Sequence, residues 1–444
     1  MIQWKKQKTL INIMKKIIYT CLLVLGSIFL KAQQTPAPAQ QKSMLITNVV
    51  IHNGLGDLIE GGAVGFSNGL ITYVGDAASA PSSFDETIDG NGQHLYPGFI
   101  APNSTLGLVE IGAVRATRDQ AEVGTLNPNV RSIIAYNAES KVTTTVRTNG
   151  VLLGQITPRS GLISGSSSIV QFDAWNWEDA VVRADDGIHI NWPSMHSRSG
   201  WWAEPGPIEK NKYYEKDVAK LHAFFEKAQA YNGERNRTKS DLKLAAMQGL
   251  FNGSKQLYVH VSRLKEIEHL LSFIDKYGIK KPVIVGGYDA HLIAEELVER
   301  NIPVMLRRVH ALPMAEDDDI DLPYRLPKLL AEKGVLFCLN NAGDMEQMGT
   351  RNLPFYAGTA AAYGLEKEEA LTLITSNTAK ILGIDDRYGS IEQGKSATFF
   401  LSEGDALDMR TNKVVAAFID GRAISLDNHQ KELYRRYKAK YEKN

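Results

Sequence analysis

The sequence has few cysteines and no surplus of charge of either sign. It contains two cysteines, Cys21 and Cys338, and Cys21 lies in an apolar stretch near the N-terminus. A chain left with Cys338 alone cannot form an internal disulfide, so its stability must come from a large core. The 50 basic and 50 acidic side chains cancel. This balance gives no reason to expect a nucleic acid or an anionic membrane as a partner.

Long apolar runs are also absent, except for one near the N-terminus. Five lysines between positions 5 and 16 precede an almost wholly apolar stretch over residues 17–30, and Ala32 offers a small residue for cleavage. This pattern predicts a secretory signal peptide over residues 1–33, because the run is short for a membrane span. An uncleaved N-terminal anchor is the alternative. We therefore expect an exported protein, periplasmic or secreted, without a transmembrane span.

Two familiar ligand loops are missing as well. The glycine- and serine-rich residues 158–168 lack the Gly-Lys-Ser/Thr of a phosphate-binding P-loop, and we interpret them as a structural loop. The acidic residues 316–321 lack the ligand alternation and the glycine of an EF-hand, so they do not predict a calcium site.

Strand and turn signals occupy both ends of the mature chain. After a Gln-, Thr-, Pro- and Ala-rich leader at 34–43, apolar runs at 44–51, 63–66 and 70–74 alternate with turns such as Ser67-Asn68-Gly69. Similar runs return at 397–401 and 414–419. We infer that residues 44–96 and 384–426 pair into one small composite β-sandwich, and that residues 427–444 form a charged C-terminal helix.

Between these ends, buried strands alternate with amphipathic helices. Apolar strands are expected at 151–156, 257–261, 282–285, 302–306 and 335–339, and the helix expected from Lys265 to Tyr277 has its apolar residues on one face. Such alternation predicts a parallel sheet covered on both faces, in the α/β class. The number of units favours a TIM-like (β/α)8 barrel over residues 97–383.

Three motifs bracket this region: LYPGFIAPNSTLGL at 95–108, ALTLITSNTAKILG at 370–383 and GSIEQGKSA at 389–397. Together they resemble the amidohydrolase superfamily, in its exported, imidazolonepropionase-like bacterial branch. The resemblance implies a (β/α)8 barrel with a composite β-sandwich. It also implies hydrolysis of carbon–nitrogen bonds other than peptide bonds, by water activated on one or two metal ions.

The metal ligands that the resemblance implies are replaced in this chain. Asn103 and Thr105 stand where the family has His-x-His, and Ala101 stands where it has Asp. A neutral amide and a hydroxyl are poor ligands for zinc. We therefore expect a degenerate metal centre, with Asn103 and Thr105 left as substrate-binding groups.

The other strand ends supply few replacements. His260 follows a barrel strand where the family often has a metal-binding histidine, so it is a candidate catalytic residue and metal ligand, or else a hydrogen-bonded rim histidine. Asp344 is the nearest carboxylate after the last strand and a candidate general base, although Asn340 and Asn341 lie closer to the family's position. The expected cofactor is one divalent metal such as zinc, or none.

Further polar and aromatic residues are candidates for substrate binding. Arg307 offers a fork for a carboxylate, or it forms a salt bridge with the acidic residues 316–321. His189 and Asn341 are expected near the barrel mouth. Five tryptophans form either an aromatic platform or the core of an inserted subdomain: Trp175, Trp177, Trp192, Trp201 and Trp202.

Two functions stay open. One is a hydrolase for carbon–nitrogen bonds with an altered or lost metal centre. The other is a catalytically inactive binding protein or partner subunit. Under either function we expect the protein to bind a small molecule. The expected protein partner is a second copy of the chain or an intact amidohydrolase relative.

Overall fold

The computed structural model describes residues 35–201, 203–234, 239–343 and 345–442. Residue contacts divide the chain into residues 1–36 and 37–444, and the fold below is that of the second part. The expected signal peptide at 1–33 lies outside the described residues. Among the residues described, no helix is both long and apolar enough to cross a membrane.

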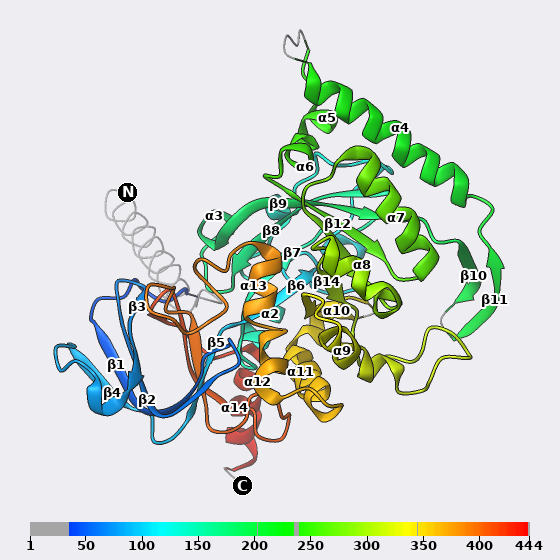
Figure 1. Ribbon diagram of the computed structural model, residues 1–444. Helices are drawn as coiled ribbons and strands as arrows, with labels where there is room; N and C mark the ends of the chain where they lie inside the picture. Colours follow the sequence, from blue (N-terminus) through cyan, green and yellow to red (C-terminus); the bar gives the residue numbers. More distant parts are fainter. Residues whose placement is uncertain (1–34, 202, 235–238, 344, 443–444) are drawn as a thin grey trace, which may run out of the picture. The chain divides into compact units, whose positions relative to one another are not determined.

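The first sheet is built from both ends of the chain (Figure 1). β5 pairs antiparallel with β16, with Tyr96 opposite Phe400, so the two terminal segments share one sheet as expected. Its order is β18-β17-β16-β5-β1-β2-β3, with β4 beside β1. A second packed layer stays a prediction. The strands are β1 (Met44–His52), β2 (Leu58–Ser67), β3 (Leu70–Asp76), β4 (Glu86–Asp89), β5 (His94–Pro97), β16 (Phe399–Ser402), β17 (Val414–Ile419) and β18 (Arg422–Ala423).

The second sheet has eight strands in the order β15-β14-β13-β12-β9-β8-β7-β6. β6 and β7 run parallel, as do β9 and the strands from β12 to β15. The strands are β6 (Phe99–Ser104), β7 (Val151–Ile156), β8 (Ile163–Gln171), β9 (Val181–Asn191), β12 (Gln256–Val261), β13 (Pro282–Gly286), β14 (Val304–Leu306) and β15 (Phe337–Leu339).

One strand of this sheet corrects two expectations. β8 is antiparallel to both of its neighbours, so the sheet is not parallel throughout, and residues 163–168 belong to a strand rather than to a loop. Six residues, 157–162, separate β7 from β8, which is too few for the helical crossover that a parallel neighbour needs. The serines and glycine of β8 are small enough for a strand that is buried along its whole length.

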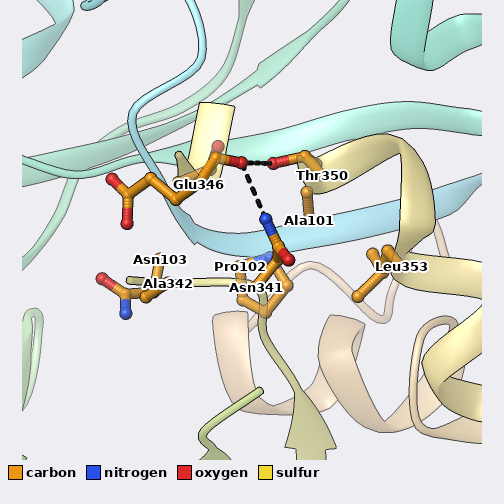
Figure 2. Close-up of a pocket in the computed structure, with 9 residues that line it drawn as sticks. Ala101, Pro102, Asn103, Asn341, Ala342, Glu346, Thr350 and Leu353 are labelled. Carbon is orange, nitrogen blue, oxygen red and sulfur yellow. Dashed lines mark hydrogen bonds between the residues drawn. The ribbon is translucent and has the colours of Figure 1, made fainter. Parts of the chain in front are cut away.

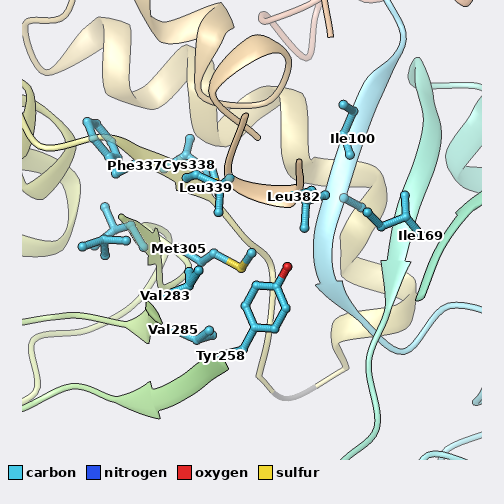
Figure 3. Close-up of a cluster of buried hydrophobic side chains, with 14 of the residues drawn as sticks. Ile100, Ile169, Tyr258, Val283, Val285, Met305, Phe337, Cys338, Leu339 and Leu382 are labelled. Carbon is cyan, nitrogen blue, oxygen red and sulfur yellow. The ribbon is translucent and has the colours of Figure 1, made fainter. Parts of the chain in front are cut away.

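The sheet closes almost completely into a barrel. The backbone N–H of Leu339 in β15 donates to the carbonyl of Leu373 at 3.0 Å, and that of Ile100 in β6 donates to the carbonyl of Ile374 at 3.0 Å. Residues 373 and 374 therefore bridge the first and last strands. Figure 3 shows Met305, Val283 and Val285 packed beside the ring of Tyr258 in the barrel core.

Helices connect and cover the barrel strands. α7 buries Ile267, Leu270 and Ile274, as its apolar spacing predicts, and it ends at Gly278 with a φ of 61°. The hairpin of β10 (His196–Trp201) and β11 (Glu204–Lys210) forms a separate two-stranded sheet. The α-helices are α2 (Lys141–Arg147), α3 (Trp177–Ala180), α4 (Tyr214–Gly233), α5 (Leu242–Ala246), α6 (Gln248–Asn252), α7 (Leu264–Tyr277), α8 (Ala294–Glu299), α9 (Leu322–Glu332), α10 (Glu346–Gly349), α11 (Leu353–Ala362), α12 (Lys367–Thr372), α13 (Ser376–Leu382) and α14 (His429–Tyr441). α14 is the expected C-terminal helix.

Candidate functional site

Two cavities lie where the barrel strands end. Both are lined by Asn103, His260 and Ala342, which lie near the carboxyl ends of β6, β12 and β15. The first has a volume of about 530 Å³, and Arg118 and Arg159 are among its other lining residues. The second measures about 360 Å³. Since the carboxyl ends of barrel strands carry the functional residues in this architecture, we take these cavities as the candidate site.

Asn103 has an unusual backbone at the end of β6. Its φ is 49°, in the left-handed region, and the pairing of β6 with β7 shifts register between Ala101 and Ser104. Asparagine tolerates this conformation better than most residues. The Asn103 N–H donates to Oε1 of Gln155 at 3.0 Å, which fixes the bulge against the neighbouring strand.

Arg159 holds the side chain of Asn103. Nη1 of Arg159 donates to Oδ1 of Asn103 at 2.9 Å, and Nη2 donates to the Asn103 carbonyl at 2.9 Å. Nη2 also lies 3.1 and 3.2 Å from the two carboxylate oxygens of Glu346. Figure 2 shows the carboxylate of Glu346 and the amide of Asn103 on the same side of this site. Because the guanidinium only donates, it identifies the amide oxygen of Asn103 and leaves Nδ2 buried without a partner among the described residues.

A chain of hydrogen bonds leads from the barrel interior to the cavities. Ser167 Oγ donates to Oδ1 of Asp186 at 2.7 Å, so its single proton is used. Nε2 of His189, 2.9 Å from the same Oγ, must then be the donor to it. Nδ1 of His189 is therefore an acceptor, and it receives the Nε2 proton of His260 across 3.0 Å. His260 consequently presents Nδ1 with its lone pair, in a side chain that lines both cavities.

Burial shifts the pKa values of the side chains in this hydrogen-bond chain. Burial, with a smaller contribution from the Arg159 guanidinium, lowers the pKa of His260 to about 3. Burial, His260 and Arg159 lower the pKa of His189 well below its ordinary value. Burial also raises the pKa of Asp186, against the opposing effect of hydrogen bonds from Tyr258, Ser167 and Gln155. Both histidines are thus neutral at pH 7.

Comparison with known proteins found matches among amidohydrolases. Residues 265–424 match the profile of the amidohydrolase family. This match supports membership of the amidohydrolase superfamily. The structure is similar to a crystal structure of an amidohydrolase from Thermotoga maritima MSB8, at a TM-score of 0.73 and 25% identity over 86% of this chain and 99% of that chain. It shares its fold with a Xaa-Pro dipeptidase crystallised with bound methionine, at a TM-score of 0.53 and 14% identity over 86% and 99% of the two chains. No curated protein matches the sequence.

These matches support the superfamily and the hydrolase class that the three motifs imply, and the nearly closed sheet fits a TIM-like barrel. Members of the family typically bind divalent metals. A metal site needs about three ligands from histidine, cysteine or carboxylate. The described residues contain no group of three such side chains that could hold an ion.

The two histidines and the nearest buried carboxylate do not fit a metal site together. His189 and His260 use the facing nitrogens to bond each other. The carboxylate of Asp186 receives hydrogen bonds from Tyr258 at 2.6 Å, Gln155 at 2.8 Å and Ser167 at 2.7 Å. Ser167 separates this carboxylate from His189 in the hydrogen-bond chain, so Asp186 does not supply the missing ligand.

The other predicted site residues are divided between the cavities and their walls. Thr105 lines the first cavity and Arg307 the second. Asn341 instead donates to the Glu346 carbonyl at 2.7 Å and accepts from Tyr356, so it supports the loop after β15. Asp344, the predicted base, lies outside the described residues.

Arg307 makes no salt bridge with an acidic residue of 316–321 within the described structure. Its guanidinium lies 5.7 Å from the ring centroid of Tyr288, whose hydroxyl donates to Asp318 at 2.8 Å. Among the described residues, Tyr288 therefore lies between Arg307 and the acidic segment. Burial lowers the pKa of Arg307, and the guanidinium remains a candidate for binding an anion in the second cavity.

The tryptophans divide between core and surface. Trp192 is buried, donates to the Tyr214 hydroxyl at 3.4 Å and packs edge-on against Phe273. Trp175 and Trp201 are exposed, and Trp177 is partly buried against the core. Trp202 lies outside the described residues. Trp192 alone of the described tryptophans lines one of the two cavities, so the platform hypothesis reduces to that residue.

The sequence analysis missed the residues that organise the site. Arg159 and Glu346 were not singled out, and neither were Gln155, Ser167 or Asp186. Arg159 follows closely on a fully buried strand, which is a signal for a residue at the barrel mouth. Asp186 carries a different signal, since it is an acidic residue that alternates along its strand with the apolar Ile188 and Ile190.

Proposed function

We propose that the protein is a hydrolase of the amidohydrolase type that acts on carbon–nitrogen bonds other than peptide bonds, in a centre with altered metal ligands. The family match and the Thermotoga neighbour support the hydrolase class. Two hydrogen bonds support the altered centre. His189 and His260 bond each other at 3.0 Å, and Asn103 is bonded to Arg159 at the position of the first expected ligands.

The side chains at the cavities suggest how a substrate would be held. The lone pair on Nδ1 of His260 accepts a hydrogen bond from a substrate N–H or from a water molecule. With a pKa of about 3, His260 is a weak proton acceptor at pH 7, so its contribution would be to orient that group. Arg307 lines the second cavity and is a further candidate for contacting the substrate.

Turnover and metal content test this proposal together. The purified mature protein would be assayed on amides, lactams, hydantoins and dipeptides, with and without added zinc, while its metal content is measured by elemental analysis. We expect turnover that His260→Ala abolishes and that His196→Ala, at an exposed position on β10, leaves unchanged. Stoichiometric zinc that is lost in His260→Ala would contradict the altered centre.

A second candidate function is a binding protein or partner subunit without turnover. The low pKa of His260 and the missing third ligand among the described residues favour it. It requires a stable metal-free protein that binds a small molecule, alone, as a homo-oligomer or together with an intact amidohydrolase relative. Turnover that depends on His260 would rule it out, and co-purification with such a relative would support the partner role.

We also propose that the protein is exported to the periplasm or secreted. The basic and then apolar N-terminal pattern of residues 1–33 supports this. The test is N-terminal sequencing of the protein from the periplasmic and culture fractions. A mature start near residue 34 is expected, whereas an intact N-terminus in the cell membrane would favour the anchor.

A further inference from the structure

A guanidinium lies among the polar groups where the family resemblance places a metal ion. Arg159 is bonded to two oxygens of Asn103, at the end of the first barrel strand, and to Glu346, in the segment that follows the last strand. The family resemblance implies metal ligands at these same two places, the end of the first barrel strand and the segment after the last. The oxygen atoms that converge here thus already surround a permanent positive charge, because arginine does not lose its proton in proteins.

The charge of Arg159 acts on its neighbours as a bound cation would. It is among the causes that lower the pKa of both His260 and His189. Its bonds to Asn103 and Glu346 use Nη2 and one hydrogen of Nη1, leaving Nε and the other Nη1 hydrogen without a partner among the described residues. Both are strong donors for an anionic or carbonyl oxygen.

The first cavity brings this cation together with a second one and with an acceptor. Arg118 and Arg159 both line it. The single described carboxylate among its lining residues is that of Glu346, which Arg159 already binds. His260 lines the same cavity and presents the lone pair of Nδ1. A ligand that satisfies these groups carries an anionic oxygen for the guanidiniums and an N–H for the imidazole.

We propose that Arg159 replaces a metal ion as the fixed cation of this site, and that the first cavity binds a small molecule with a carboxylate and an amide N–H. The volume of about 530 Å³ accommodates a ligand of that size. This inference deepens the proposed function by giving its substrate class. It holds equally for the binding protein, since it requires no turnover.

The test is isothermal titration of the full mature protein with two probes. N-acetylglycine has a carboxylate and an amide N–H, and N-acetylglycinamide is its uncharged counterpart. We expect N-acetylglycine to bind at least about tenfold more tightly, a difference of about 1.4 kcal/mol. Equal affinities, or no binding of either probe at millimolar concentration, would overturn the proposal.

Variants assign the preference to Arg159. Arg159→Gln should remove most of it and Arg159→Lys should restore part, whereas Arg131→Gln should keep it, because Arg131 pairs with Asp185 and lines neither cavity. Arg159→Gln leaves Glu346 without its cation, so Arg159→Gln/Glu346→Gln is the second variant if the first fails to fold. Arg118→Gln, at an exposed residue, should weaken the preference without unfolding the protein. An unchanged preference in the Arg159 variants contradicts the assignment.

A metal measurement separates this inference from the proposed function. The protein would be dialysed against zinc, desalted and analysed for bound metal. We expect well under one zinc per chain, whatever the result of the turnover assays. One zinc per chain that depends on His260 would overturn the role of Arg159, while absent turnover alone would contradict only the hydrolase.

Discussion

His260 donates from Nε2 to Nδ1 of His189 across 3.0 Å, a direction that follows because Ser167 gives its proton to Asp186 and accepts from His189. The order of donors continues through Ser167 to the carboxylate of Asp186. The mouth of the barrel thus presents an acceptor whose orientation is set by a carboxylate three side chains away. A buried polar chain of this kind is stabilising only while every member is satisfied.

Replacing Ser167 tests the continuity of this chain. Ser167→Ala removes a donor to Asp186 and the acceptor for His189, both buried. We expect the free energy of unfolding to fall by about 1–3 kcal/mol, the cost of leaving buried polar groups unpaired. Urea denaturation monitored by circular dichroism measures it. Ser197→Ala, on the exposed strand β10, is the matched control and should have little effect.

The lowered pKa values of the histidines predict an acid-sensitive fold. In the unfolded chain a histidine binds a proton below about pH 6.5, whereas folded His260 stays neutral down to about pH 3. The unfolded state therefore binds more protons in this range, and stability is lost as the pH falls from about 6.5 towards 3, by up to about 1.4 kcal/mol per pH unit for each such group.

Urea denaturation at pH 7, 6 and 5 checks this slope. His260→Gln removes the titrating ring and should flatten the pH dependence, while His196→Gln at an exposed position should not. A histidine ring at position 260 whose NMR signals titrate near pH 6.5 would contradict the expectation.

A buried ion pair joins α2 to the segment that follows β8. Nη1 of Arg147 lies 2.7 Å from Oδ1 of Asp173, with both side chains 1% exposed, and Arg422 of β18 lies 2.9 Å from Oδ2. Asp173→Ala leaves two cations with no counter-charge, so we expect a loss of about 3–5 kcal/mol in unfolding free energy. The measurement is chemical denaturation. Asp408→Ala, which breaks an exposed pair with Arg410, should have a much smaller effect.

Restoring the family's ligands tests whether Arg159 opposes metal binding. Asn103→His/Thr105→His supplies two imidazoles but retains Arg159, whose positive charge opposes a second cation. We expect little zinc in this variant and more when Arg159→Ala is added. Elemental analysis after zinc dialysis measures both. Equal zinc in the double and triple variants would show that Arg159 is not the obstacle.

The elements predicted from the sequence are those with a local or periodic signal. α7 has its apolar stripe and its terminal glycine, and the pairing of β5 with β16 follows from two strand-rich ends of one chain. The antiparallel β8 was missed because its serines and its glycine resemble a loop when their burial is unknown.

The site was harder to predict because its contacts have no periodicity. Arg159 meets Asn103 from 56 positions away and Glu346 from 187. Such pairings depend on which strand ends become neighbours, and a single sequence does not contain that information. That Asn103 and Thr105 replace the usual ligands stays a prediction from the sequence, which gave no sign that Arg159 bonds Asn103.

The sheet that joins both termini has a consequence for how the chain matures. Synthesis begins at the N-terminus, so β5 is made first. One edge of β5 gains its partner only when β16 has been made, about 300 positions later. Until then a bare strand edge is open to wrong pairing. The last strands therefore decide when this layer closes, so the sheet is complete only once the C-terminal segment of the chain is available for pairing.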